Sequence, residues 1–538
     1  MNVTTRLQAD VVVVGAGSAG CAIAGRLSED PNLQVVLVEA GGADRNPWIH
    51  VPIGYFKTIG SDATDWRFLT EPEKELAGRR IAWPRGKVLG GSSSINGMLY
   101  VRGHAADYDG WRDAGNTGWG WSDVLPFFRK AESQCRGADD WHGADGPLTV
   151  SDIAPDPLSD AFVQAMAQHG VRTQPDFNRG DSEGAGYFQM TTRKGRRQSA
   201  ARAYLAPARH RRNLRIVTGA TVSRVEIAGG RAVAVECTAG IERFRVGARR
   251  EVVVACGALQ SPVLLQRSGI GPGGLLQSMG IAVLRDLPGV GANLQDHLQV
   301  RLVLRCNRPL TLNDLYHRPL RRLSAGWTYL TRRSGPLVTG IHPAGAFVRV
   351  HPLAQRPDVQ IHFALVSFER LGGPLDRFSG FSLSACVLYP HSRGSIRIAS
   401  PDPATPAHMR AGYLDDERDR DLIVRSVPWM RQVAAQPALA RLVAEEVRPG
   451  PACATPEQVL AYVRQTAFSV HHQAGTCAMG RGAQAVVDER LRVHGVDGLR
   501  VADASIMPTL VGGNTNAPSI MIGEKAADLI RADLKGAA

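Results

Sequence analysis

The chain has 538 residues, of which 44% are hydrophobic and 21% charged, and it contains 58 glycines. This length exceeds what one compact core usually holds, so we expect at least two structural units, and the composition excludes a disordered or collagen-like protein. The formal net charge is +13, but 56 of the 63 basic residues are arginines spread over the whole chain. Because no segment concentrates them beside stacking aromatic residues, we expect no nucleic acid partner.

Cysteine usage and hydropathy predict a cytoplasmic protein. The eight cysteines have no CxxC spacing, and several lie in apolar runs, so we expect reduced thiols and no metal site. The amino terminus leads into a strand within about ten residues, which leaves no room for a signal peptide. No uninterrupted apolar stretch reaches the ~18 residues that a membrane span requires.

Elements at the two ends of the chain predict a nucleotide-binding fold. A β-branched run at 10–14, a helix at 19–29 and a strand at 35–39 form a βαβ unit that opens a doubly wound sheet. The final segment adds a strand at 499–502 and a closing helix from about residue 518. Further strands are predicted at 214–217, 222–227, 233–237 and 251–255.

The pattern changes after about residue 300. Residues 415–447 predict a helical hairpin that Pro428 and Pro437 interrupt. Apolar, β-rich segments between Pro and Gly turns predict an antiparallel sheet from 345–350, 358–365, 381–388 and 394–399.

The predicted fold class is α/β, or α+β overall, with a Rossmann-like dinucleotide-binding domain and an inserted substrate domain that contains an antiparallel sheet and helices. We assign residues 1–300 and 472–538 to the discontinuous first domain, with small excursions into the second near 150–195. Residues 301–471 form the predicted substrate domain.

The sequence VVVGAGSAG places Gly15, Gly17 and Gly20 between the first strand and its helix. Gly15 permits a tight turn, Gly17 lets backbone N–H groups approach a pyrophosphate, and Gly20 permits close packing of the helix on the strand. Glu39 ends the second strand, where a carboxylate can accept hydrogen bonds from ribose hydroxyls. These residues predict a dinucleotide, but they do not distinguish NAD from FAD.

Further motifs follow in order along the chain. They are GKVLGGSSSINGMLYVRG at 86–103, a glycine-flanked helix at 257–271, GVGANLQDH at 289–297, HHQAGTCAMG at 471–480, and a segment containing VADAS and NAPSIMIGE at 499–530. With these motifs the sequence resembles the glucose–methanol–choline (GMC) flavin oxidoreductases from end to end. It is most similar to the bacterial choline dehydrogenase and alkanol dehydrogenase branch.

This resemblance implies that the dinucleotide is FAD. Ile95 stands where some family members have a histidine bonded covalently to the flavin, so we expect non-covalent binding. The family's fingerprint matches Gly15, Gly17, Gly20 and Glu39. The loop along the flavin matches Val88, Gly91 and Asn96, the strand residue at the adenine matches Val222, and the carboxylate near the ribityl chain matches Asp503.

The resemblance also places the catalytic base at His472, in H-x-x-G-T, and its partner at Asn516. Imidazole titrates near neutrality and can take the hydroxyl proton while a hydride leaves the carbon. The Asn516 amide would orient the substrate oxygen or stabilise an alkoxide. Because neighbours on an extended segment point to opposite sides, we expect His471 to face away from the flavin. We expect the other histidines, including His297, His342 and His362, to be structural.

The predicted reaction is oxidation of an uncharged primary alcohol to the aldehyde, with hydride transfer to flavin N5. Choline dehydrogenase is an alternative, but the segment from Gly335 to Phe368 offers only Asp358 to balance a quaternary ammonium. An alcohol oxidase that uses oxygen is another alternative. A lyase or a photodecarboxylase is more remote, although both are possible on this fold.

Residues 315–333 predict an amphipathic helix. Leu320, Leu323, Trp327 and Leu330 fall on one face and are flanked by arginines, as in a helix that lies on a membrane surface. Such a contact would place the protein peripherally at the inner face of the membrane and favour a quinone over oxygen as the electron acceptor. The alternative is an ordinary helix packed on its domain with solvated arginines.

Overall fold

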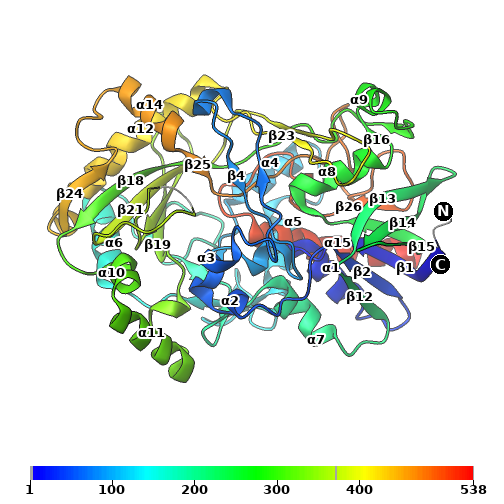
Figure 1. The fold of residues 1–538 in the computed structure, drawn as a ribbon, viewed down its shortest axis with the longest axis horizontal. Helices are drawn as coiled ribbons and strands as arrows, with labels where there is room; N and C mark the ends of the chain where they lie inside the picture. Colours follow the sequence, from blue (N-terminus) through cyan, green and yellow to red (C-terminus); the bar gives the residue numbers. More distant parts are fainter. Residues whose placement is uncertain (1–3, 370–371, 537–538) are drawn as a thin grey trace.

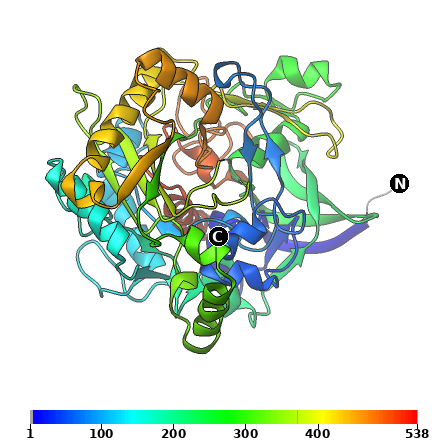
Figure 2. The ribbon, with the colours of Figure 1, turned by 60° about the vertical axis from the view of Figure 1, so that its left-hand side comes forward.

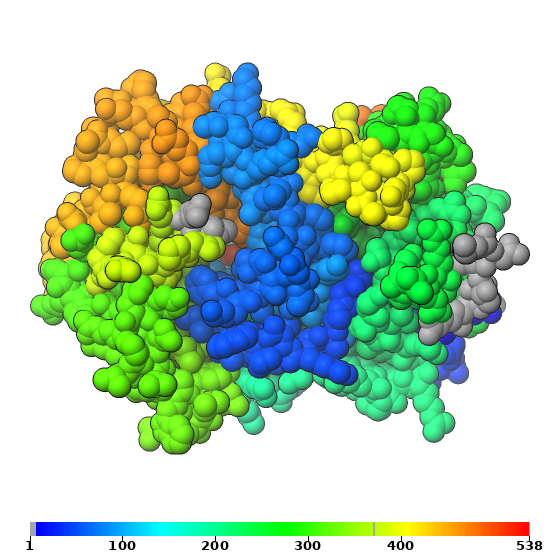
Figure 3. Space-filling view, viewed as in Figure 1, coloured from blue at the N-terminus to red at the C-terminus, as the bar shows by residue number. Residues whose placement is uncertain are grey.

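The computed structural model describes residues 4–369 and 372–536, and its two large sheets lie side by side. In Figure 1 the first sheet is on the right and the second on the left. Figure 3 shows residues from about 40 to 100, in blue, across the front of the molecule between them.

The first sheet has the strand order β12-β2-β1-β15-β14-β13, with β26 beside β15. Its β1, β2, β12, β15 and β26 run parallel, while β14 pairs antiparallel with β15, and β13 pairs antiparallel with β14. The strands predicted at both ends of the chain are confirmed. They are β1 (Thr4–Val14), β2 (Val35–Glu39), β12 (Leu214–Thr218), β13 (Thr221–Ala228), β14 (Arg231–Ala239), β15 (Glu242–Val254) and β26 (Leu499–Val501).

Helices α1 (Ser18–Leu27) and α15 (Asn516–Gly536) pack against each other beside this sheet. Their contact is close because small residues face it: a Cβ added to Gly523 would lie 2.6 Å from the carbonyl oxygen of Ala19. Farther along, the Arg26 guanidinium donates to the buried Glu524 carboxylate at 2.8 Å. The contact fixes the carboxyl-terminal helix beside the start of the glycine fingerprint.

The second sheet has the order β24-β18-β21-β20-β19-β8, with β25 beside β18, and all its pairs are antiparallel. Strand β18 begins at Leu298, and β8 lies in the segment near 150–195 that was predicted to enter the second domain. The strands of this sheet therefore nearly coincide with the predicted substrate domain. The domain division itself stays a prediction. The strands are β8 (Gly184–Tyr187), β18 (Leu298–Cys306), β19 (Ala344–Val348), β20 (Val359–Ala364), β21 (Gly380–Val387), β24 (Val443–Arg448) and β25 (Phe468–Ser469).

The strand predicted at 394–399 does not join this sheet. Residues there form the short β22 (Ser395–Arg397), which pairs with β23 (His408–Arg410) in a separate ladder. The buried Gln266 holds the segment against helix α8 (Gly257–Arg267): its side-chain amide donates to the Ile396 carbonyl oxygen and accepts from the Ile398 N–H.

The helical hairpin predicted at 415–447 is also wrong. Helix α12 (Glu417–Ala434) continues through Pro428, a short helix α13 (Pro437–Ala440) follows, and the chain returns as β24. One internal proline removes one backbone donor, and burial of Ile423, Val427 and Met430 outweighs that loss. Pairing with β18 converts the ambiguous sequence VAEEVR into an edge strand.

The predicted helix at 315–333 is two helices, α10 (Leu312–His317) and α11 (Pro319–Arg332), which meet at Arg318. Helix α11 projects from the body of the molecule in both ribbon views (Figures 1 and 2). Among the described residues, no helix has the length and apolar character needed to cross a bilayer. The other main helices are α4 (Ala105–Asp113), α5 (Trp121–Ala131), α6 (Pro157–Gln168) and α14 (Pro456–Thr466).

Candidate functional site

A cavity of about 490 Å³ lies between the two sheets. Gly15, Gly17 and Glu39 line one end, and His472 lines the other. The loop at 86–103 borders the cavity between these ends through residues such as Gly91, Ser92, Ile95, Asn96, Gly97, Met98 and Leu99. The cavity therefore connects the predicted nucleotide site with the predicted catalytic histidine.

The glycines of the fingerprint have the expected roles in the turn. Gly15 has φ +97°, and a Cβ at Gly20 would lie 1.9 Å from the Gly15 carbonyl oxygen, which explains the close helix packing. A Cβ at Gly17 would meet nothing nearer than 3.9 Å, so this residue leaves space toward the cavity. No side chain caps the amino terminus of α1, whose free N–H groups fit a pyrophosphate.

The Glu39 carboxylate is fixed next to this turn. Its two oxygens accept hydrogen bonds of 2.8 Å from the backbone N–H groups of Ala16 and Gly41. Burial raises the pKa of Glu39 to about 7, although both N–H groups oppose that shift. Each oxygen keeps a second lone pair, so Glu39 can still accept a ribose hydroxyl from the cavity side.

The predicted flavin loop packs directly on the fingerprint. Gly91 has φ +52°, and a Cβ there would lie 2.7 Å from the Gly17 Cα. Asn96 lines the cavity while its side-chain oxygen accepts a 2.7 Å hydrogen bond from Arg197. Val88 is buried and pairs through its backbone with Gly42, so its side chain supports the loop without lining the cavity.

Val222 and Asp503 both line the cavity, as predicted for cofactor-binding residues, although neither role is tested. Asp503 is buried, and one carboxylate oxygen accepts hydrogen bonds from the Gly257 N–H at 2.8 Å and the Ser261 hydroxyl at 2.5 Å. Burial raises the pKa of Asp503 against these donors. The residue thus fixes the start of α8 at the cavity wall.

His472 is positioned by the pairing of two motifs that are far apart in the sequence. The N–H and C=O groups of Gln295 and Ala474 bond to each other at 3.0 Å, and the Gly291 N–H donates to the Thr476 carbonyl oxygen. Asp296 then fixes the backbone at the histidine, because its carboxylate accepts a 2.8 Å hydrogen bond from the His472 N–H.

The His472 ring contacts Asn514 rather than the predicted Asn516. The Asn514 amide nitrogen lies 3.1 Å from His472 Nε2. Asn516 is the first residue of α15, and its side-chain oxygen accepts a 2.8 Å hydrogen bond from the Ser18 hydroxyl. The two asparagines belong to one motif, but the turn before α15 directs only Asn514 at the histidine. The structure therefore favours Asn514 as the partner.

The other ring nitrogen of His472 contacts His297, which we had expected to be structural. The two Nδ1 atoms are 2.9 Å apart, and His297 Nε2 lies 2.8 Å from the Leu388 carbonyl oxygen. Burial lowers the pKa of His297 to about 4, so this ring is neutral near pH 7. A carbonyl oxygen can only accept, so His297 carries its proton on Nε2 and presents a bare Nδ1.

These donors and acceptors fix the protonation of His472. Because His297 Nδ1 accepts, His472 carries its proton on Nδ1 and leaves its Nε2 lone pair toward Asn514 and the cavity. Gln360 supports this arrangement, since its amide nitrogen donates to the Asn514 side-chain oxygen at 3.2 Å. Burial, followed by the nearby His297, lowers the pKa of His472 well below its ordinary value. His472 is therefore a neutral acceptor at the cavity.

His471 does not point away from the cavity as predicted. It has φ +66°, so the segment is not extended there, and both His471 and His472 line the cavity. Burial lowers the pKa of His471 to about 3, and its Nδ1 has no hydrogen-bond partner in the described chain. Only the His472 ring makes the contacts with Asn514 and His297.

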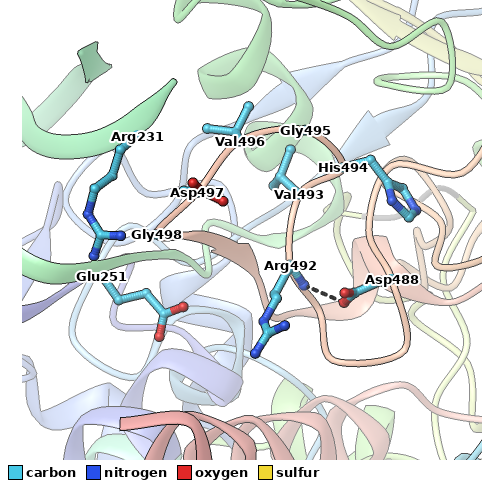
Figure 4. Close-up of a pocket in the computed structure, with 10 residues that line it drawn as sticks. All are labelled: Arg231, Glu251, Asp488, Arg492, Val493, His494, Gly495, Val496, Asp497 and Gly498. Carbon is cyan, nitrogen blue, oxygen red and sulfur yellow. Dashed lines mark hydrogen bonds between the residues drawn. The ribbon is translucent and has the colours of Figure 1, made fainter. Parts of the chain in front are cut away.

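A second hollow of about 290 Å³ lies on the surface, away from these residues (Figure 4). It is lined by residues of the loop at 488–498 together with Arg231 and Glu251. Its carboxylates bond to the protein itself: within the loop the Asp488 carboxylate accepts from the Arg492 N–H at 2.8 Å, and the Glu251 carboxylate on β15 accepts from Arg500 on β26. We assign this hollow a structural role.

Comparison with known proteins identifies the family. Family models described as GMC oxidoreductase match residues 9–299 and 390–523. The chain belongs to the GMC oxidoreductases. This membership confirms the predicted family, fold class and reaction class: the protein is an FAD-dependent oxidoreductase that acts on CH–OH donors.

Relatives match this chain over nearly its whole length. An alcohol dehydrogenase [acceptor] from Pseudomonas putida is 40% identical over 525 residues, covering 97% of this chain and 95% of that protein. An oxygen-dependent choline dehydrogenase from Rhizobium etli is 42% identical, covering 97% and 96%. Among solved structures, pyridoxine 4-oxidase from Mesorbium loti has a TM-score of 0.89 and 33% identity, covering 97% and 99%.

Substitution of Gly91 should remove the cofactor. In Gly91→Val the new Cβ would overlap Gly17 and require a strained φ, which together cost about 3 kcal/mol or more. We expect FAD affinity to fall roughly 100-fold or more, measured by flavin absorbance per chain and by titration of the apoprotein. The matched control is Gly42→Ala, whose Cβ would meet nothing within 4 Å. Wild-type flavin content in Gly91→Val would contradict the proposed contact of this loop with FAD.

Proposed function

We propose that the protein oxidises a primary alcohol to the aldehyde, with His472 as the base and Asn514 as the group that holds the substrate oxygen. One observation carries this proposal. The Leu388 carbonyl oxygen accepts from His297 Nε2, and His297 Nδ1 accepts from His472 Nδ1. The Nε2 lone pair of His472 is therefore directed at Asn514 and the cavity. A hydroxyl placed between His472 Nε2 and the Asn514 amide can give its proton to the first and accept a hydrogen bond from the second.

Each group near His472 has a separate role in this step. FAD, when bound, supplies the acceptor of the hydride that leaves the alcohol carbon. His472 takes the hydroxyl proton on Nε2, and His297 then accepts a stronger hydrogen bond from the positively charged ring. The amide of Asn514 donates to the oxygen as negative charge develops there. Asp296 keeps the His472 backbone in place throughout.

The proposed FAD linkage is non-covalent. Ile95 lines the cavity at the position where some family members have a histidine bonded to the flavin, and an aliphatic side chain cannot form that bond. Unfolded protein should therefore release intact FAD.

The charges along the cavity argue against choline. Of the described residues that line it, the carboxylates are Glu39 and Asp503, and both belong to the proposed nucleotide end. Asp358 does not line the cavity, because its carboxylate accepts from the Val350 and His351 N–H groups in a turn. A quaternary ammonium would have no carboxylate partner, so we propose a primary alcohol without a cationic group.

Anaerobic mixing with alcohols tests the reaction and the base together. The wild-type flavin should bleach with primary alkanols and show little response to choline. His472→Ala should keep its flavin and bleach about 100- to 10,000-fold more slowly, as expected for loss of a general base. His494→Ala, which removes a histidine on the surface hollow, should react like wild type. Rapid bleaching of His472→Ala would refute the assigned base, and choline as the best reductant would refute the substrate class.

Removing His297 should slow the same step. In His297→Ala, His472 Nδ1–H loses its acceptor, and the unfavourable tautomer with a protonated Nε2 becomes populated. We expect the rate of flavin reduction to fall about 10- to 100-fold, which corresponds to a lost charge-assisted hydrogen bond. The control is again His494→Ala, which also loses a histidine-to-carbonyl bond. An unchanged reduction rate in His297→Ala would contradict the tautomer assignment.

A second proposal concerns α11, whose apolar face is turned outward. Leu320, Leu323, Trp327 and Leu330 are between 68% and 82% exposed, whereas the helix is anchored by the buried Ala325 and Tyr329. The arginines around it are exposed and form no ion pair within the described chain: Arg318, Arg321, Arg322, Arg332 and Arg333. We propose that this helix binds an anionic membrane surface peripherally, and that a quinone there accepts the electrons.

Co-sedimentation with vesicles tests the contact made by α11. The protein should pellet with phosphatidylglycerol-containing vesicles at low salt and remain in solution with neutral vesicles. Trp327→Glu should lose most of this binding, because it places a charge in the apolar face. Leu353→Glu is the control, since Leu353 is 77% exposed elsewhere on the surface. Equal pelleting of both variants would refute the membrane proposal, and faster reoxidation by oxygen than by a soluble quinone would refute the acceptor.

A further inference from the structure

One face of the second sheet is polar although it is buried. On β18, Val300, Leu302 and Leu304 pack into the apolar core, while the alternate residues Gln299 and Arg301 line the cavity. Antiparallel sheets usually turn such a polar face to solvent. Here Gln299 is 5% and Arg301 is 9% exposed, so the polar face is enclosed.

The strand register extends this polar face across the sheet. Arg301 pairs with Ser384 on β21, which in turn pairs with His362 on β20. His362 lines the cavity and its Nδ1 has no hydrogen-bond partner in the described chain, as is also true of Gln299 Oε1. Buried polar atoms are rarely left without a partner. These side chains therefore form a polar wall of the cavity that is suited to contact a bound polar molecule.

Arg301 is the charged group of this wall. Its Cζ lies 3.9 Å from the centre of the Phe368 ring and 4.7 Å from that of Phe468, so aromatic rings flank the guanidinium. Nη1 donates to the Phe368 carbonyl oxygen at 3.2 Å. Burial lowers the pKa of Arg301 to about 10, so the side chain is still protonated at neutral pH.

The remaining edge of this guanidinium has no partner. Nε is buried without a hydrogen bond, and Nη2 forms none with the described residues. Arg301 also forms no ion pair with a carboxylate of the described chain. The nearby Asp376 raises the pKa of Arg301 but pairs directly with Arg448. A buried cation without a direct ion pair is costly, and the Nε–Nη2 edge has the geometry that binds a carboxylate through two parallel hydrogen bonds.

Arg301 lines the same cavity as His472, and strand pairing connects their two segments. Gln299, its neighbour on the same face, pairs with Phe468, and His472 follows four residues after Phe468. On the other side, the rings of His342 and His362 are 5.4 Å apart, and both residues line the cavity. Beyond the effect of burial, Arg301 lowers the pKa of His342, and His362 lowers the pKa of His472, so the two rings are near both residues. A substrate that reaches from His472 along these neutral histidines would place its far end at Arg301.

We propose that Arg301 binds a carboxylate of the substrate, so that the preferred substrate is an alcohol that carries a carboxylate at the end remote from the reacting hydroxyl. The inference rests on the proposed function and changes the predicted uncharged alcohol to an anionic one. One negative charge balances one guanidinium, and the planar Nε–Nη2 edge matches the two oxygens of a carboxylate better than a tetrahedral dianion. The carboxylate is unchanged in the reaction, in which the carbinol carbon loses a hydride and the hydroxyl a proton.

A matched set of alcohols tests this assignment. The set comprises ω-hydroxyhexanoate, its methyl ester and hexanol, with shorter and longer ω-hydroxy acids to locate the best length. We expect wild-type kcat/KM to be about 10- to 100-fold higher for the acid than for the ester, through KM. Arg301→Gln should lower kcat/KM for the acid to the value for the ester, and Arg301→Lys should restore part of the difference. Arg305→Gln is the control, because Arg305 is on the same strand but pairs with Glu445 outside the cavity.

Binding of a carboxylate that cannot be oxidised gives an independent measurement. Hexanoate should perturb the flavin absorption spectrum of the wild type and of Arg305→Gln, and it should do so at least tenfold more weakly in Arg301→Gln. Equal kcat/KM for acid and ester, or hexanoate binding unaffected by Arg301→Gln, would overturn the role of Arg301. The proposed function fails separately, if no alcohol reduces the flavin or if His472→Ala reacts normally. The hexanoate titration requires no turnover, so it decides the role of Arg301 in either case.

Discussion

The backbone pairing of residues 291–297 with residues 470–476 is the interaction on which the site depends. It brings together His297 and His472, which are 175 residues apart, and it ends where β18 begins at Leu298. The same segment therefore brings His297 to His472 and places Gln299 and Arg301 in the cavity wall. Because side chains alternate along a strand, a shift of one residue would turn this wall into the core. The contact between His297 and His472 and the polar wall of the cavity therefore depend on the same strand register.

The fold at the ends of the chain could be predicted because its determinants are local. Gly15, Gly17 and Gly20 are close in sequence, and the strands beside them are short β-branched runs. The sequence predicted that the inserted domain contains an antiparallel sheet, but it did not predict correctly which segments form its strands. β24 has the sequence VAEEVR, which has no clear strand period, and it becomes a strand by pairing with β18 from 137 or more residues earlier. Such long-range pairing leaves little local signal.

The candidate site was predictable to the level of its motifs and not to the level of each side chain. Asn514 and Asn516 have the same chemistry and lie in one motif, and the turn before α15 decides which of them reaches His472. His297 could not be separated from a structural histidine, because its role depends on the Leu388 carbonyl 91 residues away. Arg301 was not predicted for the same reason. It stands out because its buried guanidinium has no ion pair in the described chain, and a sequence pattern does not show which side chains form ion pairs.

The chain of hydrogen bonds behind His472 also determines where protons can go. It ends at the Leu388 carbonyl oxygen, which has no proton to exchange and no further acceptor to pass one to. Alcohol oxidation releases two electrons and two protons, and the same numbers are taken up when a quinone is reduced to the quinol or oxygen to hydrogen peroxide. Because the Nδ1 side of His472 is closed in this way, we infer that a proton accepted by its Nε2 would leave through the cavity. Return of His472 to its neutral form would then be coupled to reduction of the acceptor, and substrate, product and proton would share this cavity.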